Sequence, residues 1–310
     1  MRAIRATYAV VAVILTILCL AAGNPVLAQD KDNSDSKRLS RGHGIKTGKA
    51  KLHRVYKRKF RIVTPPTEAI LLKDLTTGRI VFEQHANEQM PPASLTKIMS
   101  AIVILSEGNL DDSVVISSHA AAALPTKMYL KRGQIFPLRG LLEAMLIRSA
   151  NDACLAAAEH IAGTEEAFVV KMNAKATELG LTQTQFRNAC GFNMAQHYST
   201  AEELAKLTEY AMGYDTFSAI VKEPKAVLRQ VNRPKAFVAR TTNRLLGVME
   251  GVVGVKTGYT KAAGRCLITV VRRGDKELLL VLLNSRQRWS TAQTLLEGEL
   301  RDAPTILNTY

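Results

Sequence analysis

The chain has 310 residues, of which 47% are hydrophobic and 22% are charged. This composition allows a buried core and excludes an intrinsically disordered chain. The net charge is +15, but residues 30–61, with twelve Lys or Arg and three Asp, carry +9 of it. Arg2 and Arg5 add two charges, which leaves +4 for residues 62–310. The basic character therefore belongs mostly to an N-terminal segment and says little about the rest of the chain.

The N-terminus is typical of an export signal. Arg2 and Arg5 precede a nearly all-apolar run over residues 8–22, and Val26-Leu27-Ala28 offers a cleavage site. The run is shorter than the roughly 20 residues of a membrane-spanning helix. We therefore expect residues 1–28 to be a signal peptide, with an uncleaved anchor as the alternative. Either way, the protein is expected to work outside the cytoplasm, in the periplasm or cell envelope.

Residues 29–62 are polar and basic and show almost no apolar periodicity. This pattern predicts a flexible linker. Either the linker is a solvated tether, or residues 30–61 contact an anionic surface such as wall polymer or lipid headgroups. The charge alone would also allow nucleic acid as a partner, but export argues against it, so no nucleic-acid partner is expected.

Ordered structure is predicted to begin near Pro65-Pro66. Strands over residues 68–74 and 79–85 flank the turn Thr76-Thr77-Gly78 and predict a hairpin. Residues 94–106 are apolar on almost every face, which is typical of a buried helix. Further helices are predicted over residues 138–147, 150–161, 165–179, 200–212 and 289–300, and further strands over residues 254–257, 266–272 and 278–283.

Strands thus open and close the region 63–310, and helices fill its middle. The simplest assembly is an α+β fold, in which one antiparallel sheet is built from both chain ends and a helical region is inserted between them. Three cysteines, Cys154, Cys190 and Cys266, remain after loss of the signal. Their odd number argues against a disulfide framework, so we expect buried free thiols, with one pair as the alternative.

Ser94-Leu95-Thr96-Lys97 is the first motif that indicates chemistry. Positions i and i+3 share one face of a helix, so the Lys97 amine can reach the Ser94 hydroxyl. Burial disfavours the charged form of a lysine, and a neutral amine is a competent general base for serine. The pattern alone is weak, because Ser34-Asp35-Ser36-Lys37 matches it as well. That copy lies in the polar linker, where the lysine would be hydrated and protonated.

Ser149-Ala150-Asn151 is the second motif, and it stands at the predicted start of a helix. Ser149 could simply cap that helix. In the functional interpretation, Ser149 relays a proton and Asn151 binds a substrate amide. The motif by itself does not decide between these two roles.

Lys256-Thr257-Gly258 is the third motif, at the end of a valine-rich strand. Gly258 has no side chain, so a substrate backbone could approach the strand closely. Lys256 and Thr257 offer a cation and a hydroxyl to a carboxylate. This motif also has a copy in the linker, Lys46-Thr47-Gly48, with no strand around it. The ordered combination of all three motifs is far more specific than any one of them.

With these motifs, the chain resembles the low-molecular-weight penicillin-binding proteins, the D-alanyl-D-alanine carboxypeptidase and endopeptidase family (serine peptidase family S11). The resemblance spans about residues 65–300. It is carried by residues 92–99, 149–154, 197–200 and 254–264, which contain the three motifs and the segment His197-Tyr198-Ser199-Thr200. The resemblance implies a β-lactamase/DD-peptidase-like fold and makes residues 63–310 a DD-peptidase catalytic domain.

The resemblance also implies roles for individual residues. Ser94 attacks the carbonyl of the penultimate D-alanine and forms an acyl-enzyme, with Lys97 as the base. Ser149 shuttles protons, and Asn151 holds the amide on the acyl side. The expected partners are peptidoglycan stem peptides, with β-lactams as inhibitors that trap Ser94, and the expected biological role is in cell-wall biogenesis and cell shape.

On the other side of the site, the resemblance assigns Lys256 and Thr257 to binding of the terminal carboxylate, next to Gly258. The backbone N–H groups of Ser94 and Tyr259 are expected to form the oxyanion hole. No cofactor is implied, and no His-Glu-x-x-His or Cys-x-x-Cys motif is present to bind a metal.

Two features depart from the family pattern. Asn188-Ala189-Cys190-Gly191-Phe192 replaces a more usual Asn-Pro/Ser-His-Gly-Leu, so Cys190 could border the cleft. Only 52 residues follow Gly258, which is too few for the additional β-rich domain and anchor helix of many carboxypeptidases. This compactness favours an endopeptidase, but the sequence leaves the choice between carboxypeptidase and endopeptidase open.

Three other functions compete with this interpretation. A serine β-lactamase shares the fold and the motifs, but a class A enzyme needs a Glu-x-x-Leu-Asn loop, which is absent. A Ser-His-Asp hydrolase would need a Gly-x-Ser-x-Gly elbow, also absent, so His197 is expected to be structural. A non-catalytic wall-binding protein is the third alternative, and the complete set of motifs argues against it.

Overall fold

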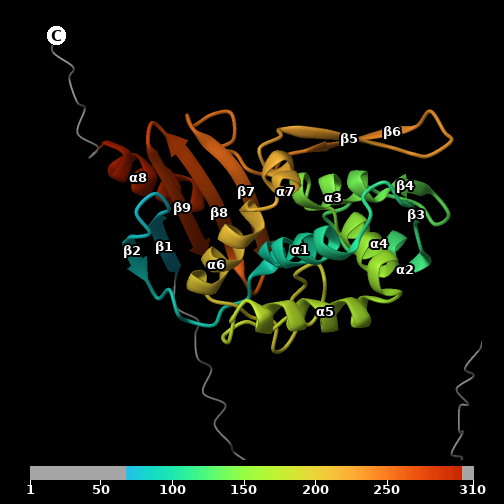
Figure 1. The fold of residues 1–310 in the computed structure, drawn as a ribbon, viewed down its shortest axis with the longest axis horizontal. Helices are drawn as coiled ribbons and strands as arrows, with labels where there is room; N and C mark the ends of the chain where they lie inside the picture. Colours follow the sequence, from blue (N-terminus) through green and yellow to red (C-terminus); the bar gives the residue numbers. More distant parts are fainter. Residues whose placement is uncertain (1–67, 302–310) are drawn as a thin grey trace, which may run out of the picture. The chain divides into compact units, whose positions relative to one another are not determined.

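The computed structural model describes residues 68–301, and these form an α+β fold around one five-stranded sheet (Figure 1). The order of the strands is β2-β1-β9-β8-β7, and every neighbouring pair is antiparallel. The first two strands of the described chain therefore pair with the last three. The strands are β1 (Ala69–Asp74), β2 (Ile80–Gln84), β7 (Val252–Thr260), β8 (Gly264–Arg273) and β9 (Lys276–Leu283).

A helical region is inserted between β2 and β7, as Figure 1 shows. This confirms the predicted α+β layout, and most of the predicted long helices begin and end within one or two residues of their expected bounds. The helices are α1 (Lys97–Glu107), α2 (Ser118–Ala121), α3 (Leu138–Ile147), α4 (Asn151–Ala162), α5 (Glu165–Glu178), α6 (Ala201–Met212) and α7 (Asp215–Val221).

Two short hairpins accompany these helices, and the sequence analysis did not predict them. β3 (Ser113–Val115) pairs with β4 (Ile135–Pro137), and β5 (Lys225–Arg229) pairs with β6 (Ala236–Arg240). Strands of three residues are too short to show a period, and each strand of the second hairpin buries only one residue fully. Neither hairpin therefore carries the alternation that predicts a strand.

The central strands of the sheet are buried on both faces, which explains why β9 is apolar at consecutive positions. Leu279, Val281 and Leu283 face the helical region, whereas Leu278 and Leu280 face the final helix α8 (Arg288–Arg301). This division follows the two-residue period of a strand. On the helical side, α1 is buried over most of its length and contacts α3, α4, α5 and α6. The buried α1 fixes the place where the sheet and the helical region meet.

The predicted signal peptide (residues 1–28) and basic linker (residues 29–62) lie outside the described residues, as does the predicted anionic contact of residues 30–61. The domain boundary at residue 63 therefore stays a prediction. No helix within residues 68–301 is long and apolar enough to cross a membrane.

Candidate active site

Ser94 and Lys97 lie at the junction of the sheet and the helical region. The predicted helix start is partly wrong: Ala93–Thr96 form a 3₁₀ turn (η1), and the α-helix begins only at Lys97. The side chains of Ser94 and Lys97 still lie on the same side of the turn, because residues i and i+3 nearly eclipse each other in a 3₁₀ turn. Ser94 is half-buried. Its N–H lies in the first turn, where backbone N–H groups have no acceptor within the helix.

The Lys97 amine is fully buried and makes three polar contacts. Its Nζ lies 2.7 Å from Oδ1 of Asn151, 2.6 Å from the carbonyl oxygen of Cys190 and 3.3 Å from Oγ of Ser94. Two of the partners are carbonyl oxygens, which can only accept hydrogen bonds, whereas a hydroxyl can accept or donate. The structure thus brings the first two motifs together around one amine.

Asn151 is the first residue of α4, and both ends of its side chain are engaged. Its Oδ1 accepts from Lys97, and its Nδ2 donates to the carbonyl oxygen of Leu124 at 2.8 Å. An amide nitrogen carries two hydrogens, so one remains for a substrate. The next residue, Asp152, accepts hydrogen bonds from the backbone of Met128 and Leu130 and thereby holds the loop that contains Leu124.

Ser149 does not act as the helix cap that the sequence allowed. The residue before α4 is Ala150, and no side chain caps the helix. Ser149 is buried and has a φ of 63°, an uncommon backbone conformation for a residue other than glycine. Within residues 68–301 its hydroxyl has no hydrogen-bond partner. Ser149 has a strained backbone and does not cap the helix, so a functional role explains it better than helix stability does.

The loop of residues 188–192 supplies the third partner of Lys97, a role that the sequence did not predict. Asn188 Oδ1 accepts hydrogen bonds from the backbone N–H groups of Cys190, Gly191 and Phe192, at 2.7–3.3 Å. This turn presents the carbonyl oxygen of Cys190 to Lys97. Gly191 has a φ of 85°, and a Cβ there would clash with the carbonyl oxygen of Ala93. Only glycine lets the loop pack this closely against η1.

The Cys190 thiol does not border the cleft, which corrects the expectation from the sequence. The side chain is buried, and it is the backbone carbonyl that reaches the site. Burial raises the pKa of the thiol well above its ordinary value, so the thiol is protonated at neutral pH. Cys154 and Cys266 are also buried and unpaired, which confirms the prediction of free thiols.

His197 is buried beneath the same loop and has a structural role, as the sequence predicted. Its Nδ1 accepts a hydrogen bond from the backbone N–H of Arg187 at 3.0 Å. The other ring nitrogen, Nε2, must therefore carry the hydrogen, and it donates to Oγ1 of Thr96 at 2.8 Å. Burial lowers the pKa of His197 to about 4. A neutral imidazole thus ties the loop segment to η1.

The third motif lies on the edge strand β7. Lys256 is buried, and its Nζ donates to the carbonyl oxygen of Thr257 at 3.0 Å. Burial, and then the charge of Lys97, lower its pKa well below the usual value. The Thr257 hydroxyl lies 2.5 Å from that of Thr242. Thr242 was not predicted as a site residue, because a lone threonine in a loop forms no recognisable sequence motif. The Tyr259 side chain is exposed.

Gly258 brings β7 against the nucleophile turn. A Cβ at this position would lie 3.1 Å from Cβ of Ala93 and 3.2 Å from the backbone nitrogen of Ser94. From the sequence, the missing side chain of Gly258 was expected to admit a substrate. The structure shows that the missing side chain makes room for the turn around Ser94, so the three predicted motifs lie together in one place.

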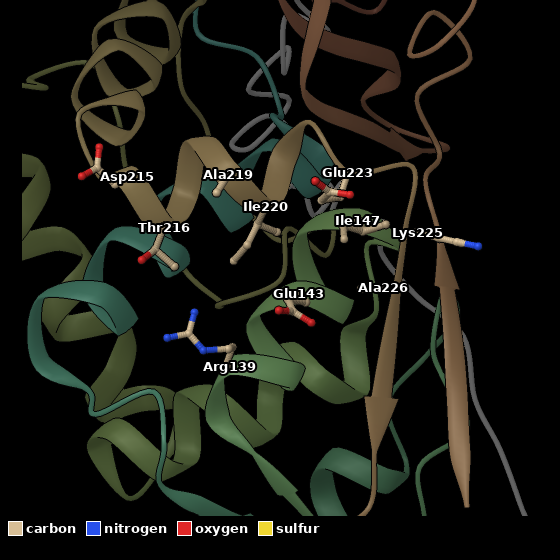
Figure 2. Close-up of a pocket in the computed structure, with 10 residues that line it drawn as sticks. All are labelled: Arg139, Glu143, Ile147, Asp215, Thr216, Ala219, Ile220, Glu223, Lys225 and Ala226. Atoms are coloured by element: carbon tan, nitrogen blue, oxygen red, sulfur yellow. The ribbon is translucent and has the colours of Figure 1, made fainter.

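A cavity of about 540 Å³ lies between α3, α7 and β5 (Figure 2). Arg139 and Glu143 of α3 line it from one side, and Thr216 and Ile220 of α7 line it from the other. Burial raises the pKa of Glu143. None of the predicted site residues lines this cavity, so it is separate from the site around Ser94.

A serine hydroxyl that meets a buried lysine amine, beside an edge strand and a strained helix start, is typical of serine hydrolases that use lysine as base. The comparison with known proteins agrees with this class. The sequence family described as D-alanyl-D-alanine carboxypeptidase matches residues 63–287, and the chain belongs to this family.

Several characterised relatives have the same description. The chain is 36% identical over 234 residues to the D-alanyl-D-alanine carboxypeptidase DacF of Bacillus subtilis, which covers 74% of this chain and 60% of the relative. It is 33% identical over 255 residues to DacC of Escherichia coli, with 77% and 62% covered. The chain thus spans about three fifths of the length of these two relatives.

Solved structures share the fold. The DD-transpeptidase of Streptomyces K15 superposes with a TM-score of 0.70 at 29% identity, covering 75% of this chain and 96% of that one. The D-alanyl-D-alanine carboxypeptidase DacD of Francisella tularensis gives a TM-score of 0.69 at 28% identity, covering 77% and 70%. Both similarities confirm the predicted DD-peptidase-like fold.

Proposed function

We propose that the protein is a serine DD-peptidase that cleaves D-alanyl bonds in peptidoglycan stem peptides through an acyl-enzyme at Ser94. The observation that carries this proposal is the buried Lys97 amine, 3.3 Å from Oγ of Ser94, with carbonyl oxygens as its other two partners. Membership of the D-alanyl-D-alanine carboxypeptidase family supports the choice of substrate class.

Lys97 acts as the general base in its neutral form. A neutral amine has two N–H groups and one lone pair, which matches the three partners of Lys97. The two N–H groups are directed to Asn151 and Cys190, which leaves the lone pair for the Ser94 hydroxyl. As Oγ attacks the peptide carbonyl, its proton moves to Nζ of Lys97.

The negative charge that develops on the carbonyl oxygen is stabilised by the backbone N–H groups of Ser94 and Tyr259. Gly258 makes this arrangement possible, because it lets β7 approach the Ser94 turn within van der Waals distance. The tetrahedral intermediate collapses when the C–N bond breaks. Its leaving amine takes the proton from Lys97 through the Ser149 hydroxyl, which has no other partner in the described structure.

The remaining residues bind the substrate. The free amide hydrogen of Asn151 donates to a carbonyl oxygen on the acyl side. Thr257 donates to the carboxylate of the leaving residue, and Lys256, the residue before it on β7, contributes to the same part of the site. A water molecule then hydrolyses the acyl-enzyme by the reverse sequence of proton transfers. β-Lactams acylate the same serine because their strained amide enters the same site.

In this proposal the protein is exported and acts in the cell envelope, where its basic linker either is a solvated tether or contacts anionic wall polymer or lipid. The same chemistry serves two reactions. A carboxypeptidase releases D-alanine from pentapeptides, whereas an endopeptidase converts cross-linked dimers to monomers. Digestion of purified muropeptides by the full-length enzyme distinguishes them by their products.

The decisive test is acylation by penicillin, followed by intact mass spectrometry. The wild-type protein is expected to gain one acyl group, and Ser94→Ala is expected to gain none. The linker offers a matched control: Ser34→Ala changes the serine of the other Ser-x-x-Lys motif and should acylate like the wild type. An adduct on Ser94→Ala, or none on the wild type, contradicts the proposal.

Adduct lifetime and a genetic rescue distinguish the two alternatives. A β-lactamase would deacylate rapidly and destroy the penicillin in many turnovers, whereas a DD-peptidase keeps the adduct for a long time. If the protein only binds the wall, Ser94→Ala should rescue cells that lack the gene as well as the wild type does. We expect a persistent adduct and no rescue by Ser94→Ala.

A further inference from the structure

The connection from β3 to β4 and the hairpin β5–β6 concentrate positive charge in one part of the molecule. Residues 127–135 and 225–240 contain eight Lys or Arg and no Asp or Glu. All of residues 62–310 together carry only +4, so the rest of this region carries −4. Charge that is gathered in this way on a nearly neutral domain gives one surface a positive potential.

Residues 131–135, which lead into β4, and the β5–β6 turn of residues 230–235 enclose a groove of about 700 Å³, the hairpin groove. Four basic side chains line it, and all four are exposed: Lys131, Arg132, Arg233 and Lys235. In the described part of the chain, none of the four is paired with a carboxylate. The exposed cations Arg79, Lys206 and Arg272 are paired, at 2.8–3.0 Å. Like charges without a counter-ion repel one another, so an anion in the groove is stabilised.

Contacts between the two hairpins hold the groove in shape. The backbone N–H of Val231 donates to the carbonyl oxygen of Ile135 at 2.9 Å. Beside this bond, the rings of Phe136 and Phe237 pack edge to face, with their centroids 5.8 Å apart. The four cations therefore stand on a fixed backbone, and a ligand that binds them pays little for ordering the chain.

The shape and lining of the groove favour a polymer chain over a flat lipid surface. Three side-chain amides lie among the cations: Gln134, Gln230 and Asn232. Amides both donate and accept hydrogen bonds, so they suit the hydroxyl and peptide groups of a polymer. Among the described residues that line the groove there is no Trp, Phe or Leu, the side chains with which lipid-binding elements enter a bilayer.

The groove and the proposed active site lie at opposite ends of α3. This helix begins three residues after Ile135 and ends two residues before Ser149, and its ten residues span about 15 Å. The β5–β6 hairpin extends beyond α3 on the side away from the sheet (Figure 1). A polymer strand that places one peptide beside Ser149 can therefore reach the groove with a neighbouring part of the same strand.

We infer that the hairpin groove is a second binding site for peptidoglycan, separate from the site around Ser94. The ligand is a stretch of polymer whose stem peptides carry free carboxylates, and the four cations bind it without cleaving it. The groove holds the enzyme on the insoluble wall while one stem peptide reacts at Ser94. This inference rests on the proposed function for the identity of the polymer, and it separates binding of the wall from binding of the cleaved peptide.

The test measures binding to purified, insoluble peptidoglycan sacculi by sedimentation. All proteins are full-length and carry Ser94→Ala, so that cleavage cannot change the sacculi. The groove variant is Arg132→Gln/Arg233→Gln/Lys235→Gln. We expect it to need about tenfold more sacculi for half-maximal binding than the protein with the intact groove, a difference that shrinks as salt is added.

The matched control variant is Arg79→Gln/Lys206→Gln/Arg272→Gln, which removes three exposed cations from other elements and therefore the same net charge. Its binding should stay within about twofold of that of the intact groove. The basic linker is present in every protein, so its charge contributes equally to all of them.

A second measurement uses the groove variant with Ser94 restored. Penicillin should acylate it at the wild-type rate, which shows that the fold and the site around Ser94 are intact. It should also digest soluble muropeptides at the wild-type rate but digest sacculi more slowly, because only the insoluble polymer reaches both sites at once.

Equal sacculus binding by the groove variant and the protein with the intact groove, or an equal loss in the control variant, overturns the inference. So does a groove variant that keeps its affinity for sacculi but loses affinity for vesicles of phosphatidylglycerol and phosphatidylcholine, because the groove would then serve a lipid surface. These results leave the proposed function standing. The proposed function falls if penicillin does not acylate the wild-type protein, and sacculus binding by the Ser94→Ala proteins then still tests the groove.

Discussion

His197 makes the stability of this protein depend on pH in a way that the structure predicts. Its pKa falls from an ordinary 6.5 to about 4 because the ring is buried. Between these two values the unfolded chain binds a proton that the folded protein does not bind. The contribution of His197 is therefore fully present above pH 6.5 and is lost as the pH falls toward 4.

The size of this effect follows from the same two pKa values. From pH 8 to pH 5, protonation of His197 in the unfolded chain costs the folded state about 2 kcal/mol. The assay is urea unfolding at both values. The free energy of unfolding of wild type should fall by about 2 kcal/mol more than that of His197→Gln, which has no titrating ring. Comparing the two falls removes the contributions of the carboxylates, which both proteins share.

His85→Asn is a suitable control, because His85 is exposed and asparagine tolerates its positive φ. This variant should lose as much stability as the wild type between the two pH values. If wild type and His197→Gln lose the same free energy, His197 is not the buried neutral ring described above, and the link between Thr96 and the loop would have to be redrawn.

Two further predictions concern the packing around Ser94. Gly258→Ala places a methyl group 3.2 Å from the Ser94 backbone nitrogen and should slow acylation by penicillin about tenfold, whereas Gly298→Ala in α8 meets no atom within 4 Å and should leave the rate unchanged. Asn188→Ala removes the acceptor of three backbone N–H groups and should cost about 2–4 kcal/mol in urea unfolding, together with at least a tenfold slower acylation. Asn173→Ala, which loses its bonds to the Phe186 backbone, should destabilise the fold without a comparable loss of acylation rate. Equal acylation rates for either pair would refute the role given to that residue.

The motifs themselves could be found in the sequence because each is local. A serine and a lysine three residues apart share one side of any helical turn, and a glycine after two strand residues marks a close approach. The apolar environment of residues 94–106 also separated Ser94 from the identical motif in the linker. The central strands of the sheet could also be found locally, because a strand that is buried on both faces is apolar along its whole length.

The partners of these motifs depend on tertiary contacts that leave no local pattern. The carbonyl oxygen of Cys190 reaches Lys97 across 93 positions of sequence, and a backbone carbonyl is present in every residue. Thr242 is likewise an ordinary loop residue until the fold brings its hydroxyl beside that of Thr257. The sequence by itself determined which residues carry the proposed chemistry and which elements hold them. Only the tertiary structure decided what surrounds them, because burial, hydrogen-bond geometry and the meeting of like charges are properties of distance in space.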